Sequence, residues 1–261
     1  FAMQDDDEQW MALRYDLTAP LARFAAENYQ DLAKPYRRYQ FGEVFRNEKP
    51  GPGRFRQFVQ CDADTVGAGG PSADAEMIAL AAEVMRAAGL SDGEFVVRVN
   101  DRRLLDGVLE SLGQAAPDRR LRVLRAIDKL DRLGRDGVEQ LLGAGRKDES
   151  GDFTEGAGLD ADGRGRVLEF LEAGGGSRSD VIERLEAVAG TGAGADGLGA
   201  LAEIDAVLTA IGVGPERAVF DPAVVRGLGY YTGPVFEAEL LASATYEDGR
   251  PIQFGSVGGG G

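Results

Sequence analysis

Two segments with alternating apolar residues, separated by a short loop, place the strongest limit on the fold of this chain. Residues 37–46 and residues 54–62 both carry aromatic and β-branched side chains at strand-like spacing, a composition typical of β-strands. Between them, residues 47–53 read NEKPGPG, and glycine and proline in such a cluster favour a turn. Two strands about a loop of this kind predict an antiparallel β-hairpin.

Helix and strand signals continue on both sides of the hairpin. Thr18 is a candidate N-cap for a helix that has Pro20 in its first turn. A second helix is expected from Ser72 to a stop at Gly89, followed by a short strand over residues 95–99. The predicted apolar face of that second helix consists of Met77, Leu80, Ala81, Val84, Met85 and Ala88.

Helical patterns dominate between about Asp101 and Gly199, and we interpret this region as a helical insertion with mobile links. The glycine-rich breaks within it are residues 155–164, 174–176 and 190–199. A further helix over residues 200–211 and strands over 217–220 and 234–241 follow. The predicted fold class is α+β: an antiparallel sheet flanked by helices and interrupted by the insertion. The expected division is a first core part over residues 1–100, the insertion over 101–200, and a second core part over 201–261.

The composition excludes several kinds of chemistry. The chain has no histidine, which removes every mechanism that depends on an imidazole base. Its one cysteine, Cys61, can form neither an internal disulfide nor a structural zinc site, and this usage fits the cytoplasm. Because no run of about 18 apolar residues occurs, no membrane span is expected.

A basic island contrasts with the net charge of −15. Between positions 34 and 56, only Glu43 and Glu48 oppose a group of seven cations. These cations are Lys34, Arg37, Arg38, Arg46, Lys49, Arg54 and Arg56. Since guanidinium groups bind phosphate oxygens in pairs, the island indicates a phosphate-bearing ligand; the alternative is a solvated, positively charged hairpin.

The hairpin carries side chains suited to binding a nucleoside triphosphate. Arg46 and Arg54 flank the loop, Glu48 can accept a hydrogen bond from an adenine amino group, and Phe58 offers a ring on which a base can stack.

Four segments resemble motifs of one enzyme family. Residues 45–48 (FRNE) and 54–58 (RFRQF) are similar to motif 2 of class II aminoacyl-tRNA synthetases, in which an FRxE strand, a loop and an RxxxF strand hold ATP. Residues 226–233 (RGLGYYTG), followed by PVFE, resemble the histidine-specific signature of the histidyl-tRNA synthetase family. Residues 13–18 (LRYDLT) and 60–64 (QCDAD) resemble that family's amino-acid-binding turn and the strand end that reads the imidazole. The resemblance implies a class II synthetase-type antiparallel sheet.

The resemblance also implies a set of site residues. Asp16, Thr18 and Gln60 would meet the α-amino group of L-histidine, whereas Asp64 and Tyr231 are candidates for its two imidazole nitrogens. The implied histidine pocket consists of Asp16, Thr18, Gln60, Asp64, Arg226, Tyr230 and Tyr231. The implied ATP site consists of Arg46, Glu48, Arg54 and Phe58, and the implied catalytic residues are Arg46 and Arg226. Adjacent tyrosines in a strand face opposite sides, so one of Tyr230 and Tyr231 is expected to reach the ligand.

This sequence departs from the family pattern at three positions. Asp16 and Asp64 stand where many members have glutamate, as in a branch that uses aspartate at both, and Gly229 stands where an acidic residue is usual. Motif 1 would precede Phe1, and motif 3 and the anticodon-binding domain would follow Gly261. The 261-residue chain alone is therefore expected to be inactive in aminoacylation.

The activity that the resemblance implies is that of a histidine–tRNA ligase in protein biosynthesis. Its substrates would be L-histidine, ATP and tRNA(His), Mg²⁺ would accompany ATP through ligands that the sequence does not identify, and the full-length protein would be a homodimer. One alternative is the regulatory subunit of ATP phosphoribosyltransferase in histidine biosynthesis, a synthetase paralogue that does not aminoacylate. The other alternative is a non-catalytic binding module with the same fold.

Overall fold

A computed structural model describes residues 1–51, 53–147, 151–225, 230–241, 244–245, 249, 251–252 and 254–261. The chain forms two compact units. The first unit consists of residues 1–69 and 243–254, and the second of residues 70–242 and 255–261. The expected division at residues 100 and 200 concerns the family's domains, and it stays a prediction.

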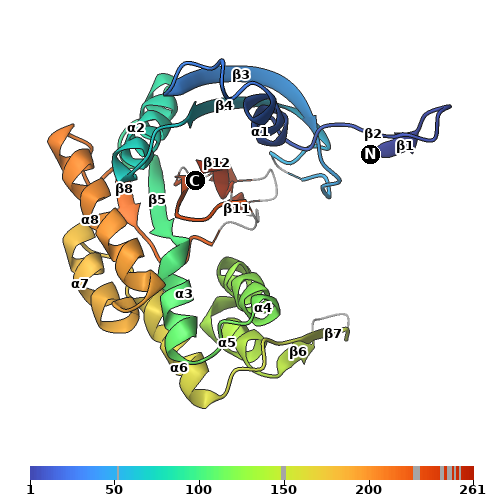
Figure 1. The fold of residues 1–261 in the computed structure, drawn as a ribbon. Coiled ribbons are helices and arrows are strands. Elements are labelled where there is room, and N and C mark those ends of the chain that lie inside the picture. The colour runs from blue at the N-terminus through green and yellow to red at the C-terminus, as the bar shows by residue number, and fades with distance from the viewer. Residues whose placement is uncertain are drawn as a thin grey trace. The chain divides into compact units, whose positions relative to one another are not determined.

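The first unit is built on the predicted hairpin. Strands β3 (Tyr36–Phe45) and β4 (Gln57–Val66) pair antiparallel without a break in register, and helix α1 (Thr18–Glu27) lies beside one face of the hairpin (Figure 1). The second strand begins three residues later than predicted, because Arg54 is still part of the loop and exchanges backbone hydrogen bonds with Gly51. Two short pairs complete the unit: β1 (Ala2–Gln4) with β2 (Trp10–Ala12), and β10 (Ala244–Thr245) with β11 (Pro251–Ile252).

The start of α1 differs from the prediction that Thr18 is its cap. Leu17 is the N-cap residue and Thr18 is the first residue of the helix. The carboxylate of Asp16 accepts a hydrogen bond from the backbone N–H of Ala19 at 2.9 Å. A carboxylate is favoured over a hydroxyl here, because it also meets the positive end of the helix dipole.

The second unit contains a four-stranded sheet in the order β12-β9-β5-β8. The central strand β5 (Phe95–Asp101) is buried along most of its length, as expected for a strand covered on both faces. Strand β9 (Pro234–Leu240) pairs antiparallel with both β5 and the glycine strand β12 (Ser256–Gly260), whereas β8 (Ala218–Phe220) joins β5 in parallel. The predicted fold class, α+β with antiparallel sheets and helices, is confirmed, and the parallel strand β8 is an addition to it.

Helix α2 (Pro71–Ala87) packs against β5, and its buried face shares only Met85 with the one predicted. Its buried residues are Ala75, Ile78, Ala82 and Met85, whereas Leu80 and Val84 are 39% and 52% exposed. Apolar residues occur around most of this helix, so periodicity alone does not select one stripe. Helix α2 packs against both β5 and helix α8, and these neighbours decide which of its stripes is buried.

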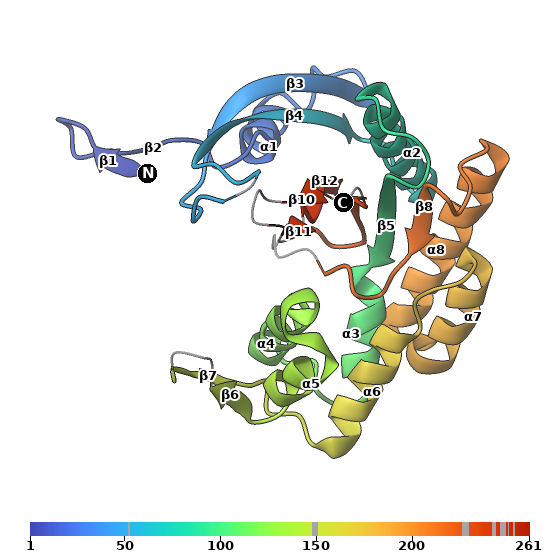
Figure 2. The same ribbon diagram turned by 180° about the vertical axis from the view of Figure 1, so that it is seen from behind.

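Helices and one hairpin fill the region between β5 and β8. The helix α3 (Arg102–Ser111) continues directly from β5 (Figure 2). The other elements are α4 (Pro117–Ile127), α5 (Leu130–Leu142), β6 (Gly145–Lys147), β7 (Phe153–Glu155), α6 (Ala161–Glu172), α7 (Arg178–Ala189) and α8 (Ala193–Ala210). Within the described residues, none of the helices is both long and apolar enough to cross a membrane.

The predicted glycine-rich break at residues 190–199 is wrong over most of its length, because α8 already begins at Ala193. Its glycines lie where α8 crosses α3. A β-carbon on Gly107 of α3 would come within 2.7 Å of the backbone nitrogen of Gly194, and one on Gly197 would meet Leu104 at 3.1 Å. These glycines therefore serve close helix packing and do not interrupt the helix.

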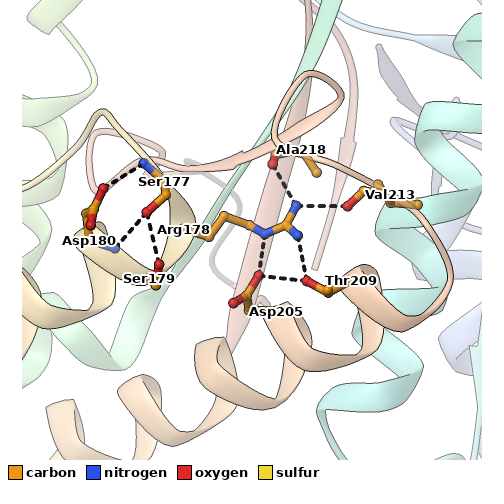
Figure 3. Close-up of polar contacts among 8 residues, drawn as sticks. All are labelled: Ser177, Arg178, Ser179, Asp180, Asp205, Thr209, Val213 and Ala218. Carbon is orange, nitrogen blue, oxygen red and sulfur yellow. Dashed lines mark hydrogen bonds and ion pairs between the residues drawn. The ribbon is translucent and has the colours of Figure 1, made fainter.

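A buried arginine holds α7, α8 and β8 together (Figure 3). Arg178 is 6% exposed, and its guanidinium donates hydrogen bonds to Asp205 at 2.5 Å and to the hydroxyl of Thr209 at 3.2 Å. It also donates to the backbone carbonyls of Val213 and Ala218, both at 3.0 Å. Because Ala218 is the first residue of β8, this arginine helps to fix that strand beside β5.

Candidate active site

Polar side chains line the inner face of the β3–β4 hairpin, the face that carries Arg38, Gln60, Asp62 and Asp64. Side chains alternate between the two faces of a strand, and the register places Arg38 opposite Asp64 and Gln40 opposite Asp62. The inner-face residues of β4 are half-buried, whereas the intervening ones, such as Cys61, are exposed. The predicted residues Gln60 and Asp64 therefore share one face of β4 with Asp62, which was not predicted.

The turn before α1 is hydrogen-bonded to this inner face. The backbone N–H of Leu17 donates to the Gln60 side-chain oxygen at 3.2 Å, and Arg38 donates to the Leu17 carbonyl at 3.2 Å. The Leu17 side chain is 1% exposed, and it lies 3.2 Å from the position that a β-carbon on Gly42 would take. Leu17 is thus fixed between strand and helix, and its neighbours Asp16 and Thr18 are held beside the inner face.

Acidic groups determine the charge of this surface. The Arg38 guanidinium lies 3.0 Å from a carboxylate oxygen of Asp64. Burial raises the pKa of Asp64, and the positive charge of Arg38 opposes this shift. Burial also raises the pKa of Asp62, and the carboxylates of Asp64 and Asp16 raise it further against the effect of Arg38 and Arg46. A surface on which neighbouring carboxylates raise the pKa of Asp62 is suited to a cation or to a strong hydrogen-bond donor.

Arg46 directly follows β3 and is held by two aromatic rings. Its guanidinium carbon lies 4.6 Å from the ring centre of Tyr15 and 5.2 Å from that of Phe58. Its Nε donates to the Tyr15 carbonyl at 3.2 Å, and its backbone N–H donates to the Arg56 carbonyl at 2.9 Å. Cation–π contacts and one hydrogen bond therefore set the plane of this arginine. A base stacked on Phe58, as predicted, would therefore contact a ring that Arg46 also contacts.

The remaining predicted nucleotide-binding residues lie in the hairpin loop. Arg54 and Glu48 form a loose ion pair with 3.7 Å between the nearest atoms, and the Arg54 side chain is 73% exposed. Arg56 donates from Nε to the Glu48 carbonyl at 3.3 Å. Arg54 and Glu48 therefore lie together near the loop tip.

In the second unit, Tyr230 and Tyr231 precede β9. Their rings meet edge to face with 4.8 Å between centroids. The expectation that they point to opposite sides is wrong, because the strand begins at Pro234 and strand alternation does not apply before it. A β-carbon on Gly261 would meet the Tyr231 ring at 2.8 Å, so this glycine lets the ring lie against the end of the chain. Arg226 and Gly229 lie outside the described residues.

Sequence reasoning missed Arg38, Asp62 and Tyr15 as part of this surface. Asp62 could have been found, because it lies between Gln60 and Asp64 at strand spacing. The pairing of Arg38 with Asp64 depends on the register, which is fixed only once the length of the loop is known. The contact between Tyr15 and Arg46 joins two segments that are far apart in the sequence, so no local sequence pattern predicts it.

Comparisons with known proteins agree on one family. The chain is 59% identical over 263 aligned residues to the histidine–tRNA ligase of Caulobacter vibrioides and 57% identical over 265 to that of Methylocella silvestris. Each alignment covers 100% of this chain and 53% of the relative. The chain therefore spans about half the length of the curated relatives that it matches.

Solved structures also resemble this one. The histidyl-tRNA synthetase of Nostoc sp. PCC 7120 has a TM-score of 0.74 at 31% identity, covering 92% of this chain and 52% of that one. A Bacillus halodurans protein described as an ATP phosphoribosyltransferase regulatory subunit/histidyl-tRNA synthetase has a TM-score of 0.73 at 28% identity, covering 92% and 57%. The family model of histidyl-tRNA synthetase matches residues 1–245, and the chain therefore belongs to the histidyl-tRNA synthetase family.

Proposed function

We propose that this chain acts within a histidine–tRNA ligase, an aminoacyl-tRNA synthetase that activates L-histidine with ATP and transfers the histidyl group to tRNA(His). The observation that carries the proposal is the inner face of the β3–β4 hairpin. There hydrogen bonds join Gln60 and Arg38 to the Asp16–Thr18 turn, Arg38 forms an ion pair with Asp64, and Arg46 is held at the end of the same hairpin. Relatives that are 57–59% identical over the whole chain and are named histidine–tRNA ligase support it.

The proposed histidine pocket follows from the charges of these groups. The α-ammonium group of L-histidine is a cation, and the acidic surface near Asp16, with the hydroxyl of Thr18 and the amide oxygen of Gln60, suits it. Asp64 would accept a hydrogen bond from one imidazole nitrogen while Arg38 orients its carboxylate. By the family resemblance, Tyr231, whose ring contacts that of Tyr230, would be the candidate for the other nitrogen.

The proposed chemistry needs no general base. The carboxylate of histidine is ionised at pH 7, so one of its oxygens attacks the α-phosphorus of ATP directly. A new bond forms between that oxygen and the α-phosphorus, and the bond to the bridging oxygen breaks. Pyrophosphate leaves with that electron pair, and histidyl-adenylate remains. Arg46 and Arg226 would stabilise the charge that gathers on the α-phosphate. Glu48, Arg54 and Phe58 would bind the rest of ATP.

Mg²⁺ belongs to this proposal as a companion of ATP. Among the described residues, no group of three or more metal-ligating side chains is suited to hold a metal ion by itself. Magnesium usually binds through one or two carboxylates together with substrate phosphates, so the donor set of the chain fits an ion that arrives with the nucleotide. When bound, the ion would neutralise phosphate charge.

Three further features are proposed from the resemblance. The full-length protein would be a homodimer. It would act in the cytoplasm, and the single cysteine supports this location because cytoplasmic proteins rarely contain disulfides. Residues 1–100 and 201–261 would form parts of the catalytic core, with residues 101–200 as an insertion.

The regulatory subunit of ATP phosphoribosyltransferase is the second candidate, because the Bacillus halodurans protein carries that description beside the synthetase name. Charging of tRNA(His) by the full-length protein separates the two. We expect formation of histidyl-tRNA that depends on both ATP and L-histidine. A full-length protein that binds histidine without charging tRNA would support the regulatory candidate.

A further inference from the structure

Asn100 is a buried polar side chain near the carboxyl end of β5, and it faces the segment that leads to Arg226. Asn100 is 2% exposed. The amide nitrogen donates hydrogen bonds to the carbonyl of Pro222 at 3.1 Å and to that of Val224 at 3.0 Å. A primary amide has two N–H donors, so Asn100 uses both of them on one turn.

The turn at residues 221–225 needs such a partner because it runs through the interior. Pro222, Val224 and Val225 are all buried. A buried carbonyl without a hydrogen-bond donor costs about as much as a lost hydrogen bond. Strand β8 ends at Phe220, so these two carbonyls lie beyond its ladder with β5. The Asn100 side chain takes the place of the ladder donors that the strand would have supplied.

Neighbouring residues of β5 reinforce the same turn. The backbone N–H of Asp221 donates to the Val99 carbonyl at 2.8 Å. The Asp221 carboxylate accepts from Arg98 and from the backbone N–H of Ala223, both at 2.9 Å. Three consecutive residues, of which Asn100 is the last, therefore hold the chain just before Arg226.

The far end of the segment is attached to the same end of β5. The backbone N–H of Arg102 donates to the Gly233 carbonyl at 3.0 Å. Strand β9 then starts with Pro234 paired to Asp101. Both ends of the segment that contains Arg226, Tyr230 and Tyr231 are thus fixed within a few residues of Asn100.

We propose that Asn100 is a positioning residue for histidine activation. By holding the carbonyls of Pro222 and Val224, it fixes the turn at residues 221–225, which directly precedes the proposed catalytic and histidine-binding residues in the sequence. The proposal rests on the proposed function. Misplacing a catalytic group by about 1 Å can lower a rate by about 100-fold, so loss of this support should reduce turnover more than substrate binding.

The test uses the full-length protein and measures histidine-dependent exchange between ATP and pyrophosphate. Asn100→Ala removes both donors, and Asn100→Asp keeps the shape but offers the carbonyls a carboxylate. Val97→Ala is the matched control, because Val97 is buried in the same strand and pairs with Ala218 and Ala238, away from the turn. Thermal unfolding of each variant shows how far the whole fold is weakened.

We expect both Asn100 variants to lower kcat by about 10- to 100-fold with the KM for ATP nearly unchanged. Val97→Ala should keep kcat within about 3-fold even where it lowers thermal stability as much as Asn100→Ala does, because deleting two methyl groups from the core leaves the turn in place. Unchanged kcat in Asn100→Ala, or an equal loss in the control, would overturn the proposal. If Asn100→Ala does not fold, Asn100→Ser, which keeps one donor, should show an intermediate loss.

Hydrogen exchange gives a readout that does not depend on activity. In Asn100→Ala, the backbone amides of residues 223–225 should exchange faster than in the wild type, whereas Val97→Ala should leave them unchanged. Equal exchange in Asn100→Ala and wild type would show that Asn100 does not hold the turn. A wild-type protein without histidine-dependent exchange of pyrophosphate would instead refute the proposed function, and hydrogen exchange would still decide whether Asn100 fixes the segment.

Discussion

Replacing Asp64 with asparagine removes one negative charge from the inner face of the β3–β4 hairpin and hardly changes the shape of the side chain. In the structure, the Asp64 carboxylate is 3.0 Å from the Arg38 guanidinium, and the two side chains are 22% and 10% exposed. If this carboxylate also accepts an imidazole N–H, the variant loses a hydrogen bond to a charged group, worth about 1.5–3 kcal/mol. The Kd for L-histidine should then rise by about 10- to 150-fold.

Calorimetry on the full-length protein measures this effect for histidine and for ATP separately. The affinity for ATP should change little, because Arg46, Glu48 and Arg54 are untouched. Glu83→Gln is the control, since it removes a carboxylate from an exposed ion pair with Arg86, and such pairs contribute little. Unchanged histidine affinity in Asp64→Asn would show that Asp64 serves the hairpin alone and would refute the proposed contact.

Three further predictions concern stability and rate. Burial and the nearby carboxylate of Asp101 raise the pKa of Asp74 to about 6. A raised carboxyl pKa costs stability above that pKa, so Asp74→Asn, after a discount for solvent screening of this partly exposed group, should stabilise the full-length protein at pH 7 by about 1–2 kcal/mol. The gain in its thermal unfolding should vanish as the pH falls from about 6 to about 4, and a gain that is independent of pH would contradict this. Arg178→Met should destabilise the fold by about 3–5 kcal/mol, because the half-buried Asp205 loses its cation and the carbonyls of Val213 and Ala218 lose their donor; a thermal midpoint equal to that of the wild type would refute the role of this arginine. Arg226→Ala should lower the single-turnover rate of adenylate formation by about 10²–10³ while histidine affinity falls much less, and a rate within a few fold of wild type would exclude Arg226 from the mechanism.

Elements with strong local signals could be predicted from the sequence. The hairpin followed from alternation about a loop of glycine and proline, and both β5 and β9 were expected within two residues of their observed ends. Gln60 and Asp64 share a face because strand spacing requires it. The predicted family was also confirmed by the family model. It could be predicted because its motifs are continuous stretches of sequence that can be read without the fold.

Features that depend on packing could not be predicted in this way. The local sequence around Gly194 and Gly197 predicts a break between helices. Both glycines instead lie within α8, where they allow its close contact with α3. The buried stripe of α2 is selected by its neighbours and not by its own periodicity. Asn100 has no motif around it, and its two hydrogen bonds join residues more than 120 positions apart.

The most direct measurement of the central claim is ATP–pyrophosphate exchange by the full-length protein with each amino acid in turn. The account predicts exchange that depends on L-histidine and that falls sharply when Arg46 is replaced by alanine, since Arg46 is held at the end of the acidic inner face. Histidine binding without any exchange would contradict the account, because the same pocket would then sense histidine without activating it.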